Sequence, residues 1–283
     1  SAAAVRFATS IGLDAAATIT GGAGADSFLG SSAADTMSGG AGIDTLVGNG
    51  GNDTINGEAG NDILTGGTGN DTIDGGAGDD TITTNTGVDV ITGGAGDDTV
   101  IMAAASLTTA DTVAGGAGSD TLNFGAAVAH TTSAADLAGI KNIEKITYDT
   151  SSTSTITVND VVFANAGVTN LDIRDLEGTQ GITVTATALS AANSITVTDN
   201  GVNKTSTVSG GAGNDTYKVT INHATALAAA DTFSGGAGSD ELIITAGNAN
   251  LTQVDQSGIT AIETITFKGL ASATFGYTLN DAT

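Results

Sequence analysis

Nine aspartates recur at intervals of nine residues between Gly21 and Ile101, a spacing that suits the binding of cations. This stretch divides without insertion into nonapeptides such as GGAGIDTLV, GNGGNDTIN and GGAGDDTVI. The eighth position of every repeat is apolar: Phe28, Met37, Leu46, Ile55, Leu64, Ile73, Ile82, Ile91 and Val100. Carboxylates and the carbonyls of glycine-rich turns are hard oxygen ligands, which favours calcium. Magnesium is disfavoured because it demands a tighter octahedral shell.

The period of nine predicts a coiled chain with two edges. Glycine favours a turn over the first six residues of each repeat, and the last three are expected to form a very short strand. Because one repeat crosses and the next returns, aspartates 18 residues apart stack. We name the two rows edge A (Asp26, Asp44, Asp62, Asp80 and Asp98) and edge B (Asp35, Asp53, Asp71 and Asp89). Stacked turns would then enclose seven calcium sites between Asp26 and Asp98.

These repeats resemble the GGxGxDxUx nonapeptides of the RTX family of calcium-binding proteins. The resemblance implies an all-β fold, a calcium-binding parallel β-roll or β-solenoid with an additional Thr-rich β region. It also implies type I secretion from a Gram-negative bacterium, with folding outside the cell where calcium is plentiful. We therefore expect an extracellular or cell-surface protein that binds about seven or more calcium ions.

Further copies of the motif extend the expected metal site. GGAGSD recurs at Asp120 and Asp240, GGAGND occurs at Asp215, and Asp111 and Asp231 occupy matching places. The second and fourth glycines of the well-formed copies are expected to contribute to the site: Gly22, Gly24, Gly40, Gly42, Gly67, Gly69, Gly76, Gly78, Gly94, Gly96, Gly116, Gly118, Gly211, Gly213, Gly236 and Gly238. Two degenerate turns, GSSAAD ending at Asp35 and TNTGVD ending at Asp89, predict weak or empty sites. Strong sites are expected along Asp44, Asp62, Asp80 and Asp98.

The composition points the same way. The 283 residues carry 31 acidic and 7 basic side chains, a net charge of −24, which repels nucleic acid and attracts cations. No apolar run is long enough to span a membrane. With 42 glycines and no cysteine, the chain is costly to order and has no disulfides, so bound metal is the expected source of stability. The start, SAAAVRFATS, lacks Met, so we expect a processed piece of a longer product.

Four regions are predicted along the chain. Residues 1–20 are expected to form N-terminal cap strands, with Val5–Thr9 and Ala17–Thr20 extended, and residues 21–123 the β-roll. Residues 124–209 form a Thr-rich β region with strands near 143–148, 155–158, 171–174, 182–187 and 195–198, and a short helical turn within 134–142. This region either continues the solenoid or packs beside it. Residues 210–283 form a second, shorter unit that duplicates about 93–148.

An enzymatic activity is not expected. Neither His130 nor His223 is followed by glutamate, so no HExxH zinc motif is present. The nearest approach to a GxSxG elbow, GSSAA at residues 30–34, ends in alanine. Glu144 and Glu263, in the matched segments NIEKI and AIETI, are interpreted as solvent-facing strand residues rather than a catalytic pair.

The remaining function classes are structural and binding proteins. An acidic, Thr-rich, calcium-stabilised solenoid without a catalytic motif is most similar to RTX-type surface-layer proteins, which predicts self-assembly into a lattice or filament. An RTX adhesin, or the C-terminal RTX module of a larger secreted toxin or hydrolase, is the alternative. Cell-surface polysaccharide is a candidate partner. Ice binding is disfavoured because the third positions of edge B, Ser32, Gly50, Thr68 and Thr86, are irregular.

Overall fold

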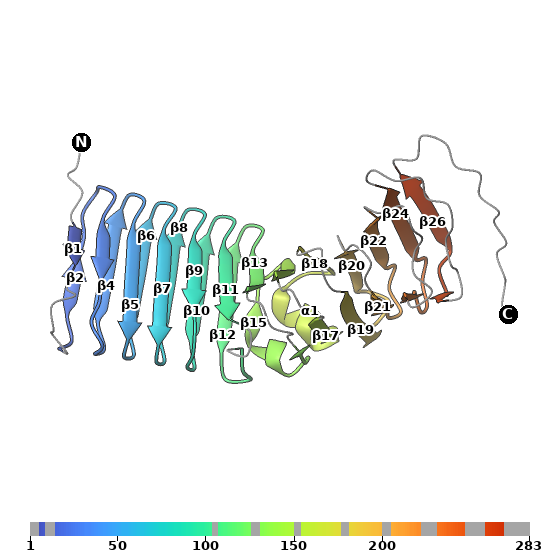
Figure 1. The fold of residues 1–283 in the computed structure, drawn as a ribbon, viewed down its shortest axis with the longest axis horizontal. Coiled ribbons are helices and arrows are strands. Elements are labelled where there is room, and N and C mark those ends of the chain that lie inside the picture. Colours follow the sequence, from blue (N-terminus) through green and yellow to red (C-terminus); the bar gives the residue numbers. More distant parts are fainter. Residues whose placement is uncertain are drawn as a thin grey trace.

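The chain folds into a parallel β-solenoid, as its sequence predicts. The computed structural model describes residues 6–8, 15–103, 107–125, 131–149, 154–176, 181–199, 205–221, 231–246 and 258–268. Every strand pairing in these ranges is parallel, and nearly all are in uninterrupted register. Figure 1 shows the coils stacked along the long axis, from β1 and β2 at one end to β26 at the other.

Three parallel sheets build the solenoid, and we call them sheets A, B and C. Sheet A extends from residue 6 to residue 268: β1 (Arg6–Ala8), β3 (Ser27–Leu29), β5 (Thr45–Gly50), β7 (Ile63–Thr68), β9 (Thr81–Thr84), β11 (Thr99–Ala103), β13 (Thr121–Gly125), β16 (Lys145–Asp149), β18 (Asn170–Asp175), β20 (Ser194–Asp199), β22 (Thr216–Ile221), β24 (Glu241–Ala246) and β26 (Thr264–Lys268). Sheet B is its partner in the repeats: β2 (Thr18–Thr20), β4 (Thr36–Ala41), β6 (Thr54–Ala59), β8 (Thr72–Ala77), β10 (Val90–Ala95), β12 (Thr112–Ala117) and β15 (Ile140–Lys141). Sheet C takes over that role afterwards: β14 (Thr131–Thr132), β17 (Ser154–Asn159), β19 (Ile182–Ala188), β21 (Thr207–Ser209), β23 (Thr232–Ser234) and β25 (Ile259–Thr260).

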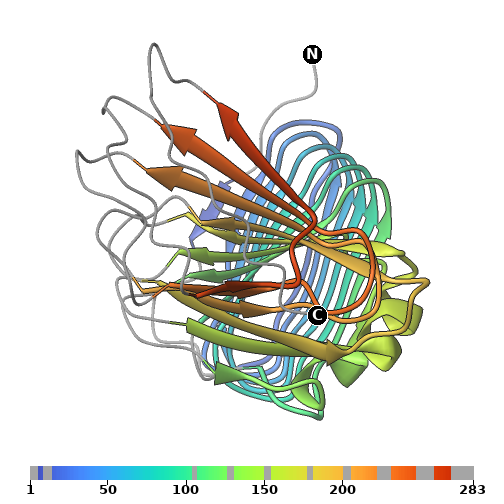
Figure 2. The same cartoon turned by 90° about the vertical axis from the view of Figure 1, so that its right-hand side faces the viewer.

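Residues 124–209 continue the solenoid, a point that the sequence left open. Sheet A passes through them without interruption, while sheet B ends at β15 and sheet C begins. The helix α1 (Asp160–Ala166) and the 3-10 helix η1 (Asp136–Gly139) pack together at this junction, where α1 also contacts β15 and β17. Asn159 caps α1 by accepting the N–H groups of Val161 and Val162 through its side chain. Figure 2 shows the closed coils end-on, with the C-terminal strands fanning away from them.

The strands of the repeats are longer than three residues, and this corrects the sequence prediction. Most have six residues, beginning at the seventh position of one repeat and ending at the third position of the next, as in Thr36–Ala41. The leading glycines are therefore part of the strand rather than of the turn. Glycine can do this because it has no Cβ, and a Cβ on Gly39 would lie under 3.0 Å from neighbouring oxygens.

The hydrophobic core changes character along the axis. Within the repeats each strand buries one large apolar side chain, the eighth residue, and all nine of these are at most 1% exposed. Beyond residue 123 the coils bury larger side chains, including Phe124, Tyr148, Phe163 and Tyr217. The rings of Phe124 and Tyr148 stack at a centroid distance of 5.2 Å across paired strands. The repeat region therefore has the thinner core and depends more on other sources of stability.

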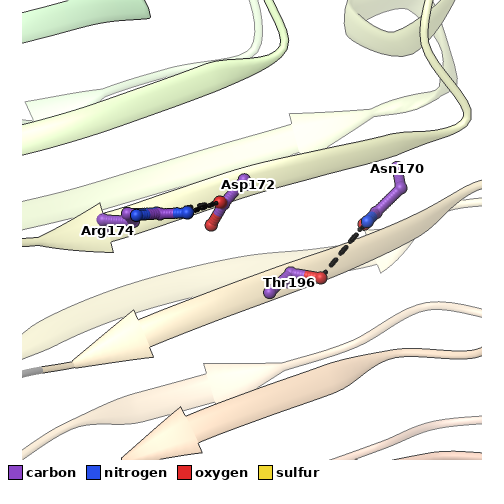
Figure 3. Close-up of polar contacts among 4 residues, drawn as sticks. All are labelled: Asn170, Asp172, Arg174 and Thr196. Carbon is purple, nitrogen blue, oxygen red and sulfur yellow. Dashed lines mark hydrogen bonds and ion pairs between the residues drawn. The ribbon is translucent and has the colours of Figure 1, made fainter.

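The outward face of sheet A carries polar contacts in its central part. Within β18, the guanidinium of Arg174 forms an ion pair with Asp172 at 2.5 Å, and Asn170 shares a hydrogen bond with Thr196 of β20 (Figure 3). Among the residues that the structure describes, this is the one ion pair. The aspartates Asp44, Asp62, Asp80 and Asp98 form no ion pair with a lysine or arginine in the described ranges, which makes an external cation the available counter-charge.

Candidate metal centres

The repeat aspartates form two buried hydrogen-bonded ladders, as their spacing of 18 predicts. On edge A, one carboxylate oxygen (Oδ1) of each aspartate from Asp44 onward accepts the backbone N–H of the aspartate one coil earlier. The distances from Asp26 N to Asp44, Asp44 N to Asp62 and Asp62 N to Asp80 are each 2.7 Å, and the ladder continues through Asp98 to Asp120. Edge B repeats this from Asp35 through Asp53, Asp71 and Asp89 to Asp111.

The second carboxylate oxygen, Oδ2, divides the aspartates into two sets. In one set it is buried and has no hydrogen-bond donor, and we call these the eight unpartnered oxygens: Oδ2 of Asp44, Asp53, Asp62, Asp71, Asp80, Asp98, Asp120 and Asp240. Their parent residues are at most 1% exposed. A buried anionic oxygen without a donor or a cation is strongly unfavourable, so each of these atoms indicates a missing positive partner.

The other set has internal donors. Oδ2 of Asp26, Asp35, Asp111 and Asp215 accepts the N–H of Gly22, Ser31, Thr108 and Gly211, respectively, each from its own turn. Oδ2 of Asp89 is not among the eight unpartnered oxygens. Asp231 is buried, and its Oδ1 accepts the N–H of Ser206. Neither of the degenerate turns, which end at Asp35 and Asp89, contributes one of the eight unpartnered oxygens, whereas the four edge A aspartates from Asp44 to Asp98 all do.

Seven of the eight unpartnered oxygens, all except that of Asp71, lie beside a backbone carbonyl of the next coil. A Cβ built on Gly39 would lie within 3.0 Å of both Oδ2 of Asp44 and the carbonyl oxygen of Gly57. The same pairing of Asp Oδ2 with a carbonyl one coil later occurs at Gly48, Gly57, Gly75 and Gly93. Carboxylate and carbonyl oxygens from two coils thus converge at a point that only glycine leaves open. This donor set fits Ca²⁺.

The glycines predicted to belong to the site lie where adjacent turns touch. Twelve have positive φ, between 100° and 144°: Gly40, Gly42, Gly67, Gly69, Gly76, Gly78, Gly94, Gly96, Gly116, Gly118, Gly236 and Gly238. A Cβ on any of them would meet a backbone oxygen of the preceding coil. For Gly40, Gly42, Gly236 and Gly238, that oxygen belongs to the predicted glycines Gly22, Gly24, Gly211 and Gly213.

Electrostatics make the ionised ladder unfavourable without metal. Burial, together with the neighbouring carboxylates of Asp62 and Asp98, raises the pKa of Asp80 to about 7. Burial likewise raises the pKa of Asp62, Asp120 and Asp215 to about 6. It also raises the pKa of Asp44, Asp53, Asp71, Asp89, Asp98 and Asp240. A divalent cation would reverse this by stabilising the ionised form.

The fifth position of the repeat carries a second ladder that sequence reasoning missed. The side-chain oxygens of Asn52, Asn61, Asn70, Asp79, Asp97 and Asn214 each accept the backbone N–H of the fifth residue one coil later, at 2.8–3.1 Å. These residues lie at the exposed outside of the turns. The signal was present as the dipeptides Asn-Asp and Asp-Asp, whose first member now has a structural role.

In the part of the chain that the structure describes, no group of three or more His, Cys, Asp or Glu side chains is placed to hold a metal ion. The centres above would instead combine one or two carboxylates with carbonyl oxygens. His130 and His223 lie outside the described residues. Glu144 and Glu263 do not lie on strands, contrary to the sequence interpretation, but in the turns that precede β16 and β26.

Comparison with known proteins identifies the repeat. The family model of the RTX calcium-binding nonapeptide repeat (4 copies) matches residues 11–46, 38–73, 47–82, 65–100, 108–126, 205–217 and 221–249, which together span more than half of the chain. No curated protein and no solved structure matches significantly. The match agrees with the parallel solenoid and with calcium as the expected ion. The chain therefore belongs to the family of RTX calcium-binding nonapeptide repeat proteins.

Proposed function

We propose that this chain is an extracellular structural protein that folds when calcium binds after secretion and then assembles with copies of itself into a surface array. The observation that supports it most directly is the set of eight unpartnered oxygens along the coil edges. Calcium at those positions would supply the missing positive partners. It would also join successive coils, since each centre takes oxygens from two of them.

Calcium binding would decide whether the repeat region is folded. One large apolar residue per strand provides little hydrophobic stabilisation, and the glycine-rich turns lose much conformational entropy on folding. In low calcium we expect residues 21–123 to be largely unfolded, a state compatible with type I export. At the higher calcium level outside a Gram-negative cell, about seven or more ions would bind and order the chain.

Assembly is supported by aliphatic side chains exposed on the repeat region. Ile43 and Ile63 are 63% and 50% exposed, and Ile63 pairs in register with Thr45, two residues after Ile43. At the start of β10 in sheet B, Val90 is 47% exposed, and Val88, in the turn before it, is 41% exposed. Contact with a second copy would remove these groups from water, which favours association. Cell-surface polysaccharide is the partner we propose for attachment of the array.

The experiment that tests this proposal combines circular dichroism with electron microscopy, with and without calcium. Chelation should remove the part of the β signal that residues 21–123 contribute and dissolve any sheets or filaments, and excess calcium should restore both. The double variant Ile63→Thr with Val90→Thr introduces the residue common at that repeat position, so it should fold with calcium but assemble less. Unchanged spectra and assemblies after chelation would contradict the proposal.

An adhesin remains a second candidate because the outer face of sheet B carries a regular row of hydroxyls. Thr18, Thr36, Thr54, Thr72 and Thr112 are exposed and stand in register, interrupted only by Val90. Such a row, spaced by one strand, suits a repetitive ligand such as a glycan. Monodisperse rods that bind polysaccharide in calcium would favour the adhesin, or the RTX module of a larger secreted protein, over a lattice.

A further inference from the structure

Edge A does not stop at the last GGxGxD turn of the repeat block. The next coil contains no such turn, and the segment Ile140–Asp149 takes its place: β15 pairs with β12, and β16 pairs with β13. The short link between them, Asn142–Glu144, therefore lies directly on the turn Gly115–Asp120.

Glu144 occupies the position of the next ladder aspartate. Its Oε2 accepts the backbone N–H of Asp120 at 2.7 Å, the same bond that Asp120 Oδ1 makes with the N–H of Asp98 at 2.8 Å. The glutamate carboxylate is thereby held against the turn Gly115–Asp120, and its Oε1 is not used in that bond. Glutamate is longer than aspartate, and it reaches the site although the segment has no glycine-rich turn.

The carbonyl of Asn142 replaces that of the first repeat glycine. A Cβ on Gly115 would lie within 3.0 Å of both the Asn142 carbonyl oxygen and Oδ2 of Asp120, the arrangement found at the repeat centres. Asn142 adopts a left-handed backbone with φ of 50°, which turns its carbonyl in this direction. Asp120 is 1% exposed and its Oδ2 has no donor.

The C-terminal unit contains the same arrangement. Glu263 Oε2 accepts the N–H of Asp240 at 2.7 Å, and a Cβ on Gly235 would meet the Ala261 carbonyl and Asp240 Oδ2. Ala261 has φ of 49°, a conformation that costs a residue with a Cβ about 1–2 kcal/mol. Four strands of sheet A separate β16 from β26, so these are two separate centres. Recurrence of a strained backbone and a carboxylate at both indicates a common role.

Edge B ends at Asp111 without a glutamate in the next coil. A ladder of aspartates can therefore end without a residue such as Glu144. Oδ2 of Asp111, the last aspartate of edge B, accepts the Thr108 N–H at 2.6 Å. That carboxylate is satisfied within its own turn. The unpartnered oxygens at ladder ends therefore occur at Asp120 and Asp240, where a glutamate follows.

We propose that the turns Asn142–Glu144 and Ala261–Glu263 complete two terminal calcium sites, with Asp120 and Asp240 as their repeat-side ligands. Each site takes carboxylate oxygens from one aspartate and one glutamate, together with the carbonyl of Asn142 or Ala261. These glutamate-containing sites extend calcium binding beyond the nonapeptide motif and close the exposed ends of the ladders. The inference rests on the calcium binding proposed above.

The test is calcium stoichiometry, measured by isothermal titration and by metal analysis after dialysis, on Glu144→Gln, Glu263→Gln and the double variant. Glutamine keeps an oxygen that can accept the Asp N–H but removes the charge, so a purely structural cap would persist. We expect each single variant to lose one tightly bound ion, or to bind it at least tenfold more weakly, and the double variant to lose two. Asp74→Asn, which removes the same charge from an exposed strand position, should bind the wild-type number.

Stability distinguishes a ligand from a cap, and the two glutamates provide independent tests. For a calcium ligand, the variants should be less stable than wild type in calcium and equal to it in chelator. Wild-type stoichiometry and affinity in both folded variants would overturn the inference while leaving the proposed function intact. If the wild-type protein bound no calcium, the proposed function itself would fail.

Discussion

The backbone N–H of Asp62 donates to Oδ1 of Asp80 at 2.7 Å, whereas Oδ2 of Asp80 is buried and has no donor. One carboxylate thus does two things. Its first oxygen fixes the register between coils, and its second is left facing the carbonyl of Gly93. Replacing the side chain with one that keeps only the first function separates folding from metal binding.

Asp80→Asn should weaken calcium binding without removing the register bond. Asparagine can still accept the Asp62 N–H through Oδ1, but an uncharged amide NH₂ replaces the anionic Oδ2. We expect the loss of at least one tight site, or about a tenfold rise in the calcium concentration needed for folding. Calcium titration followed by circular dichroism measures this shift.

Asp35→Asn provides the matched control, because Oδ2 of Asp35 already accepts the Ser31 N–H at 2.6 Å. This variant should lose some stability and bind the wild-type number of ions. An equal loss of ions in both variants would show that the hydrogen-bonding state of Oδ2 does not mark the calcium sites.

The calcium-free protein should be more ordered at pH 4.5 than at pH 7.5. The pKa of Asp80 is raised to about 7 and that of Asp62 to about 6, from 3.8, so between these values the folded state holds more protons than the unfolded state. Its stability therefore falls as pH rises through this window, and the full penalty is present above about pH 7. Circular dichroism of metal-depleted protein across this range measures the effect. Greater order at neutral pH would contradict it.

With calcium bound the pH dependence should reverse. Protons compete with the metal for the same carboxylates, so acidification should raise the calcium concentration at the folding midpoint. Calcium titrations at pH 5 and pH 7.5 compare the two midpoints directly, and equal midpoints would argue against proton competition at these aspartates.

Leu64→Ala should destabilise the calcium-bound protein by about 2–5 kcal/mol, because it leaves a cavity in a core only one side chain thick. Leu64 is fully buried between β5 and β9, the neighbours of its strand. Chemical denaturation in saturating calcium measures the loss. Ile63→Ala, at the adjacent and half-exposed position, should change stability by less than about 0.5 kcal/mol.

Asn70→Ala tests the ladder at the fifth position. The Asn70 side chain accepts the Val88 N–H at 2.9 Å, and its removal should cost about 0.5–1.5 kcal/mol without altering calcium stoichiometry. Denaturation in calcium and metal analysis together check both parts. Asn85→Ala, in the next turn of the same edge, removes an amide for which the structure shows no such bond, and it should have a smaller effect.

Much of the fold and of the candidate site follows from local periodicity, and that part the sequence determined by itself. The sixth residue of each repeat is aspartate and the eighth is apolar. Asp62 therefore comes just before the strand, at the edge of the coil, and Leu64 comes just after the strand begins, in the core. Two repeats per coil then stack Asp62 on Asp80. This pattern is local to each nonapeptide, so all nine copies favour the same turn and strand.

Only the tertiary structure decided which aspartates lack a donor, because that depends on contacts the repeat does not encode. Asp35 and Asp80 occupy the same motif position, yet the Ser31 N–H satisfies the first and nothing in the described chain satisfies the second. Glu144 lies 24 residues from Asp120, outside any motif, and it reaches that ladder because β16 pairs with β13. The exchange of sheet B for sheet C has the same origin. Pairing between strands far apart in the sequence decides where sheet C replaces sheet B, and no local pattern between residues 124 and 209 specifies which strands pair.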